Sequence, residues 1–157
     1  MRILGIDPGS TLMGFGVLES DKGQLKTIEY GVLKITGKDL PEKLLNLSNE
    51  LQKLLKKTKP EIAGIEKLFF SKNKKTAFEV AQARGVILLE LLRHKIRVVE
   101  LTPGQIKIAA TGYGNSDKIA VAKMVGKILN IAKLEHDDNA SDALAVAIAV
   151  SSRRFWG

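Results

Sequence analysis

The stretch "MRILGIDPGSTLMGFGVL", residues 1–18, decides the fold predicted for this chain. Its apolar residues run up to Asp7, where "DPGS" marks a turn, and a second strand is predicted over 13–18. A third strand is predicted over 25–35, and "DKG" at 21–23 supplies the residues of a hairpin turn between these two strands. The chain therefore opens with three strands joined by short turns.

Helices and strands alternate after this opening. Leucines at helical spacing predict a helix over 40–57, and a brief strand follows over 62–66. A basic loop, "SKNKK" at 71–75, leads to a long helix over 76–94 and then to a strand over 97–101. We therefore predict a single α/β domain over 1–157, with a mixed five-stranded sheet flanked by helices.

The C-terminal third carries clear helix-start signals. Thr102-Pro-Gly-Gln105 has the pattern of a capping box with proline in the first turn, and that helix is expected to end at Gly112. Ser116 is the expected cap of a helix that runs to about Asn130. The last helix is expected to follow Asp138, which would be its N-cap.

The composition excludes several classes of function. The chain has no cysteine and two histidines, which excludes disulfides, thiolate zinc sites and thiol catalysis and disfavours a histidine-rich metal site. The longest apolar run, 143–150, is too short to span a bilayer, and the N-terminus lacks the regions of a signal peptide, so we expect a cytoplasmic protein. The net charge of +8 favours a polyanionic partner such as nucleic acid.

Three carboxylates fall where an active site is expected. Asp7 ends the first strand, Glu66 ends the fourth, and Asp142 lies in the first turns of the last helix. An acid beside a buried strand is costly unless it is paired or binds a metal, and carboxylate oxygens suit Mg²⁺. Two such ions would suit phosphodiester hydrolysis.

Each acid also has a purely structural explanation. Asp7 suits the turn "DPG", Glu66 could pair with Lys67 or Lys72, and Asp142 could complement the helix dipole. Residue types and spacing alone leave both explanations open.

Five segments together resemble the RuvC-type Holliday junction resolvases, which are endonucleases with an RNase H-like fold. They are "GIDPGSTLMGFGVL" (5–18), "IEKLFFSKN" (65–73), "AQARGVIL" (81–88), "TPGQIKIAATGYGNSDK" (102–118) and "SDALAVAIA" (141–149). The resemblance implies a homodimer that resolves four-way DNA junctions with two Mg²⁺ ions, for which Mn²⁺ can substitute, by paired nicks in strands of like polarity. It further implies a role in homologous recombination and DNA repair, with a branch-migration helicase complex as partner.

The same resemblance implies roles for individual residues. Asp7, Glu66 and Asp142 match three of the family's four metal-binding positions, and Asn139 stands at the other, where the family has Asp or sometimes His. Phe69 matches an aromatic that stacks on a base, although a core position would also suit it, and Lys107 and Lys118 match basic positions near the scissile phosphate. The full set expected to contact DNA is Phe69, Phe70, Lys72, Asn73, Lys74, Lys75, Lys107 and Lys118. Gln82 and Arg84 match a motif near the dimer interface, with no role assigned to either.

The amide at Asn139 has two explanations. The residue was changed from an acid to disable cutting, or the lineage carries Asn naturally and Asp137 or Asp138 compensates through a shifted helix start. On a regular helix both aspartates are expected to point away from the site. Asn139 also leaves open the alternative that the chain is a non-catalytic junction-binding protein of the same fold.

The opening motif supports a further alternative. "GIDPGST" also resembles the first phosphate loop of the group that contains actin, hexokinase and the heat-shock chaperone ATPases. Those proteins need two such domains, and 157 residues supply one.

Overall fold

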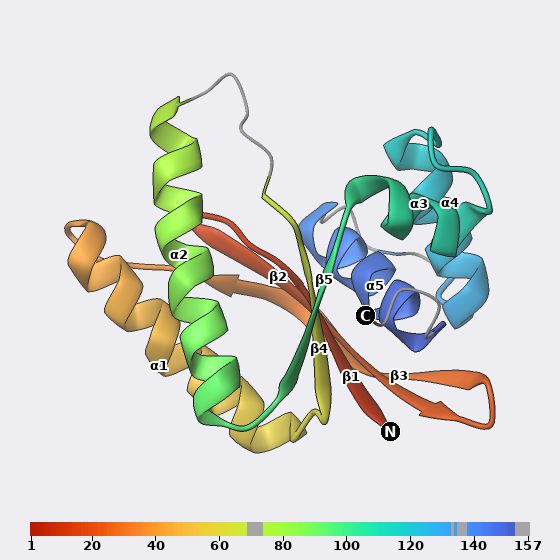
Figure 1. Cartoon of the computed structure of the whole chain (residues 1–157), viewed down its shortest axis with the longest axis horizontal. Helices are drawn as coiled ribbons and strands as arrows, with labels where there is room; N and C mark the ends of the chain where they lie inside the picture. The colour runs from red at the N-terminus through yellow and green to blue at the C-terminus, as the bar shows by residue number, and fades with distance from the viewer. Residues whose placement is uncertain (69–73, 133, 135–137, 153–157) are drawn as a thin grey trace.

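The computed structural model describes residues 1–68, 74–132, 134 and 138–152. Within these residues the chain forms five strands and five helices (Figure 1). The strands are β1 (Arg2–Asp7), β2 (Leu12–Asp21), β3 (Gln24–Lys34), β4 (Ile62–Glu66) and β5 (Arg97–Leu101). The helices are α1 (Leu40–Thr58), α2 (Lys74–Arg93), α3 (Pro103–Thr111), α4 (Lys118–Leu129) and α5 (Asp138–Ser151). None of these helices has the length and apolar character that crossing a membrane requires.

The sheet has the strand order β3-β2-β1-β4-β5. The pairs β1–β2 and β2–β3 are antiparallel, whereas β1–β4 and β4–β5 are parallel. Lys22 and Gly23 turn the β2–β3 hairpin with φ values of 46° and 86°, the left-handed geometry that tight hairpins favour. The predicted mixed five-stranded sheet is therefore confirmed, including its hairpin.

The helices divide into two layers. Helices α1 and α2 cover one face of the sheet, and α3, α4 and α5 cover the other (Figure 1). Because side chains alternate along a strand, Leu4 and Ile6 of β1 pack under α1 and α2, while Ile3 packs under α3, α4 and α5. Residues of β1 at odd positions, Asp7 among them, therefore face the α5 layer.

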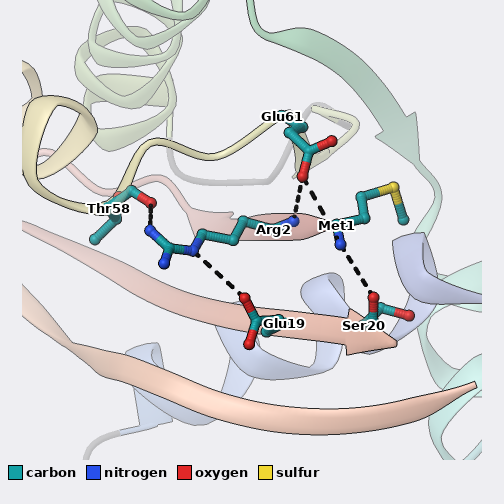
Figure 2. Close-up of polar contacts among 6 residues, drawn as sticks. All are labelled: Met1, Arg2, Glu19, Ser20, Thr58 and Glu61. Carbon is teal, nitrogen blue, oxygen red and sulfur yellow. Dashed lines mark hydrogen bonds and ion pairs between the residues drawn. The ribbon is translucent and has the colours of Figure 1, made fainter. Parts of the chain in front are cut away.

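Polar contacts join the N-terminal ends of β1 and β4 to β2 (Figure 2). The backbone N–H of Arg2 donates to Glu61 Oε1 at 2.8 Å, and its guanidinium donates to the carbonyl of Thr58 at 2.9 Å. The same guanidinium lies 3.7 Å from Glu19 Oε1, and the Met1 ammonium donates to the Ser20 carbonyl at 3.1 Å. These contacts fix the end of the sheet that is opposite to Asp7 and Glu66.

A row of three paired glycines lets α5 lie unusually close to the sheet. Gly5 of β1 pairs with Gly16 of β2 and with Gly64 of β4. A Cβ atom on Gly5 would lie 1.9 Å from the carbonyl oxygen of Ala143, and Cβ atoms on Gly16 and Gly64 would lie 2.7 and 2.4 Å from α5 side chains. Helix α5 therefore packs into the space that these glycines leave free, which we call the seat of α5.

Several helix starts differ from the prediction. The α3 capping box is confirmed, but Asp117, not Ser116, caps α4, and its carboxylate accepts a hydrogen bond from the Ala120 N–H at 2.7 Å. A carboxylate one residue nearer the helix takes the role expected of Ser116. Asp138 is the first residue of α5, not its N-cap. Helix α2 begins at Lys74, so the last two residues of the basic loop predicted over 71–75 are helical. The rest of that loop, 71–73, lies outside the described residues.

The seat of α5 predicts the effect of one added methyl group. Gly5→Ala should lower the free energy of unfolding by about 3 kcal/mol or more, because the new Cβ atom would overlap the α5 backbone. Gly104→Ala is the matched control, since its Cβ atom would approach Thr102 Oγ1 only to 4.0 Å, and should leave stability unchanged or raise it by up to about 1 kcal/mol. Urea denaturation at one protein concentration measures both. Equal stability of the two variants would contradict the close approach of α5.

Candidate active site

Asp7 and Glu66 lie side by side at one edge of the sheet. The parallel strands β1 and β4 are in register through Ile6 and Ile65, so the acid that follows in each strand faces the α5 layer. Adjacent strands lie about 4.8 Å apart, which brings the two carboxyl groups within reach of a shared ligand. Both residues line an open pocket of about 240 Å³, together with Pro8, Lys67, Leu68, Val80 and Pro103.

The first turns of α5 close this edge from one side. Gly14, which pairs with Asp7, lets the backbone of Asn139 approach so closely that a Cβ atom on Gly14 would lie 2.0 Å from the Asn139 carbonyl oxygen. Asp142 follows one turn later and its charge acts on Glu66. The four positions predicted as metal ligands therefore gather at one end of the sheet.

Lys118, the first residue of α4, bridges two carboxylates of α5. Its ammonium lies 3.0 Å from Asp142 Oδ2 and 3.6 Å from Asp138 Oδ2. Asp138 and Asp142 are four residues apart and therefore share a face of the helix. The sequence predicts that Asp138 points away from the site, but its carboxylate lies on the face of α5 that meets Lys118. Asp137, the other aspartate of that prediction, lies outside the described residues.

The electrostatics of the site follow from this crowding of charges. Burial, and then the negative charge of Asp142, raise the pKa of Glu66 above its ordinary value of 4.5, while Lys107 and Lys118 act in the opposite direction. The hydrogen bond with Asp142 is the main cause that raises the pKa of Lys118 above 10.5. Both lysines therefore lie close enough to Glu66 to act on its charge, and their place near a phosphate stays a prediction.

Arg84 of α2 supports the strand end that carries Glu66. Its side chain is 11% exposed, its Nε donates to the Glu66 carbonyl at 3.4 Å, and its guanidinium pairs with Glu100 of β5. The exposed Gln82, from the same predicted motif, lies on α2 as well. Arg84 thus ties α2 to the ends of β4 and β5, a role that the sequence did not suggest.

Several residues predicted to bind DNA are not described. Phe69, Phe70, Lys72 and Asn73 lie outside the described residues. Lys74 and Lys75 fall in the first turn of α2, and their roles remain predictions. The structure thus places Lys107 and Lys118 at the site and leaves the aromatic contacts untested.

Comparisons with known proteins agree with this arrangement. The family model for the crossover junction endodeoxyribonuclease RuvC matches residues 3–150. The chain belongs to the RuvC family. A RuvC of Thermosipho melanesiensis is 46% identical over 157 residues, which cover 98% of this chain and 99% of the relative. A RuvC of Fusobacterium nucleatum is 45% identical over 150 residues, which cover 94% and 78% of the two chains.

A solved structure extends the comparison to three dimensions. Thermus thermophilus RuvC, in complex with a Holliday junction substrate, superposes with a TM-score of 0.90 at 28% identity and covers 98% of this chain and 95% of its own. The predicted RNase H-like fold and the resemblance to RuvC are confirmed, which sets the nucleotide-binding alternative aside. RuvC proteins are metal-dependent endodeoxyribonucleases.

The residues at the sheet edge suit such a metal by their chemistry. Carboxylate oxygens and an amide oxygen are the hard ligands that divalent cations of the Mg²⁺ type prefer, and half-buried Glu66 is an acid whose charge an added cation would stabilise. Within the described ranges, no three His, Cys, Asp or Glu side chains converge closely enough to hold an ion on their own. Asp142 pairs instead with Lys118, a cation of the chain itself.

The raised pKa of Glu66 predicts that metal binding is coupled to proton release. Glu66 keeps its proton to a pH above 4.5, and a metal needs the carboxylate. The affinity for Mg²⁺ should therefore fall as the pH is lowered toward 4.5, with protons released on binding. By linkage, the contribution of Glu66 to the stability of the metal-free protein is present below 4.5 and lost as the pH rises through the raised pKa.

Calorimetric Mg²⁺ titrations in buffers of different ionisation enthalpy measure this coupling. Glu66→Gln removes the titrating group and should flatten the dependence on pH. Glu19→Gln, on the far end of β2, is the matched control. A dependence that survives in Glu66→Gln would assign the proton to another residue.

Proposed function

We propose that this chain cuts four-way DNA junctions as a structure-specific endonuclease, in homologous recombination and DNA repair. The observation that carries the proposal is the pair of acids at the ends of two adjacent parallel strands, with Asp142 brought to them by α5. The match to RuvC over residues 3–150 and the junction complex of the Thermus thermophilus relative support it. We further propose that residues 1–157 act as one nuclease domain, in the cytoplasm.

The proposed metal ligands are the carboxylates of Asp7, Glu66 and Asp142 and the amide oxygen of Asn139, holding two Mg²⁺ ions that Mn²⁺ could replace. When bound, such ions activate a water molecule and stabilise the leaving oxygen of a phosphodiester. Asp142 would exchange its contact with Lys118 for the metal, while Asp138 still holds the lysine ammonium near the site. Lys118 and Lys107 would then face the phosphate that is cut.

Contacts to DNA would surround this centre. Lys74 and Lys75 fall in the first turn of α2, and we propose that they contact DNA together with Phe69, Phe70, Lys72 and Asn73. Each lysine that neutralises a phosphate adds to the salt dependence of binding. An aromatic that stacks on a base adds affinity without sequence preference.

The outer face of α2 supports the proposed homodimer. Phe78, Leu89 and Leu92 are 67%, 48% and 65% exposed, and with Gln82 and Gly85 they recur at helical spacing along one face. We propose that this α2 stripe meets its copy in a second chain, so that two active sites nick two strands of like polarity. A branch-migration helicase complex is the further partner that the family resemblance implies.

Asn139 carries the alternative function. An amide oxygen is a weaker ligand than a carboxylate, and its NH₂ group repels a cation, so a weakened or purely junction-binding protein of the same fold is the second candidate. The place of Asp138 beside Lys118 favours a natural Asn139 with compensation from Asp138. Under either candidate, one of the two metals should bind more weakly than with four acids.

Cleavage of a synthetic four-way junction in Mg²⁺ tests the proposed activity. We expect paired, symmetric cuts, and we expect Asp7→Asn to abolish them and leave junction binding unchanged, because an amide keeps the shape of the site without its charge. Asp21→Asn makes the same charge change at the exposed end of β2 and should cut normally. Cleavage by Asp7→Asn would refute the metal role of Asp7, and tight binding by the unaltered chain without cutting would favour the second candidate.

Restoring an acid at position 139 should raise activity. With Asn139→Asp we expect half-maximal cleavage at an Mg²⁺ concentration at least about fivefold lower, since a charge next to the metal contributes on the order of 1 kcal/mol even in water. Asn49→Asp makes the same substitution on the exposed side of α1 and controls for net charge. An unchanged Mg²⁺ dependence would show that residue 139 is not a ligand.

The α2 stripe predicts the oligomeric state. Leu92→Glu places a charge in the proposed contact and should shift the protein from dimer to monomer in analytical ultracentrifugation, with loss of paired cuts. Ile28→Glu alters an exposed apolar residue of β3 and should remain dimeric. A Leu92→Glu protein that stays dimeric would move the interface elsewhere.

A further inference from the structure

Tyr113 is an exposed aromatic that neither the fold nor the proposed metal site uses. In the described part of the chain, Phe78 and Tyr113 are the aromatic side chains among the exposed large hydrophobics. Phe78 belongs to the α2 stripe, whereas Tyr113 is 63% exposed on the loop between α3 and α4, on the other side of the sheet (Figure 1). Its ring therefore has no part in the core or in the proposed dimer contact.

The loop that carries Tyr113 is held by its own hydrogen bonds. The backbone N–H of Tyr113 donates to Thr111 Oγ1 at 3.1 Å, and its carbonyl accepts from Ser116 Oγ at 2.9 Å. The hydroxyls of Thr111 and Ser116 lie 2.7 Å apart, and Gly112 ends α3 with a φ of 80°. Because these bonds use the backbone of Tyr113, the ring is presented outward from a fixed loop and can be replaced without breaking them.

Both ends of this segment belong to the proposed active site. Helix α3 begins at Pro103, which lines the pocket of Asp7 and Glu66, and the loop ends at Lys118, beside Asp142. Helix α3 rises about 12 Å from its first residue to its last. One strand of DNA covers that length in about three to four nucleotides.

The neighbouring face of α4 is suited to a nucleic acid strand. Ile119, Lys123 and Lys127 recur every four residues and are exposed, with Ile119 at 81%, while Val121 and Val125 face the core. The nearby carboxylate of Asp117 is engaged in the α4 cap. The surface around Tyr113 thus combines two exposed apolar side chains, Tyr113 and Ile119, with two lysines. A nucleic acid strand matches this surface, because its bases are planar and apolar on their faces and its backbone is anionic.

We propose that Tyr113 stacks on a nucleotide of the bound junction strand, about three to four nucleotides from the scissile phosphate. The strand that leaves the active site crosses the α3–α4 loop, and Lys123 meets its backbone on the far side. This proposal rests on the proposed junction-cutting function. It adds a DNA contact made by a residue of the α3–α4 loop, which lies outside the metal site. Tyr113 acts in substrate binding and takes no part in the chemistry.

Variants of Tyr113 separate stacking from a structural role. Stacking on one base is worth about 1–3 kcal/mol, so Tyr113→Ala should raise the Kd for a four-way junction about 5- to 100-fold. Tyr113→Phe keeps the ring and should bind within about twofold of the unaltered chain, because stacking does not need the hydroxyl. Leu45→Ala is the matched control, since Leu45 is also 63% exposed but lies on α1, across the sheet.

The closing experiment uses the full chain with Asp7→Asn, so that the junction is bound and not cut. A series of junctions carries 2-aminopurine at successive positions from the cleavage site, and fluorescence reports stacking at each. We expect quenching at one position about three to four nucleotides from the cleavage site, lost in Tyr113→Ala and kept in Tyr113→Phe and Leu45→Ala, with the Kd values changing in parallel.

Two results would overturn the proposal, and they differ in what else they imply. If Asp7→Asn binds the junction and Tyr113→Ala changes neither its Kd nor the quenching, the stacking role is wrong and the proposed function stands. If the unaltered chain neither binds nor cuts the junction, the proposed function and the stacking role are refuted together.

Discussion

The close seat of α5 on the sheet is the constraint on which the rest of the structure depends. The glycines at positions 5, 16 and 64 remove side chains in one row across three strands, and the alanine-rich α5 fills the space that they leave. Only at this separation can Asp142, on a helix, act together with Asp7 and Glu66, on strands. The same glycines therefore determine both the packing of α5 and the assembly of the site. With larger side chains at these positions, α5 would lie farther from the sheet, and Asp142 could not reach Asp7 and Glu66.

The charge balance of the site follows from this assembly. Burial, and then the negative charge of the neighbouring Asp142, raise the pKa of Glu66 above its ordinary value. The chain offsets the repulsion with its own cations, and Lys118 takes the place beside Asp142 where a metal would be expected. Asn139 lowers the negative charge further. The same lysine reaches Asp138, so a switch of Asp142 from lysine to metal would not leave the ammonium without a partner.

Motifs and periodicity predicted most of this architecture. The hairpin at "DKG" and the acids at the ends of β1 and β4 could be predicted because turn residues and strand ends are local features. The errors arose where two local signals compete or where distant segments meet. Ser116 and Asp117 are both good caps, and only the observed helix start decides between them. Arg84 of α2 donates a hydrogen bond to the carbonyl of Glu66 in β4. Neither segment alone contains a sequence pattern that predicts this contact.

The central claim is that strand acids and a helix acid share one metal centre. Paramagnetic broadening by Mn²⁺ tests it most directly, because the effect reports proximity to the ion without requiring DNA or activity. In spectra of the ¹⁵N-labelled chain, the account predicts that the amide signals of Asp7, Glu66 and Asp142 broaden together at the same substoichiometric Mn²⁺ concentration. Broadening at the strand ends with the Asp142 signal unaffected would contradict it.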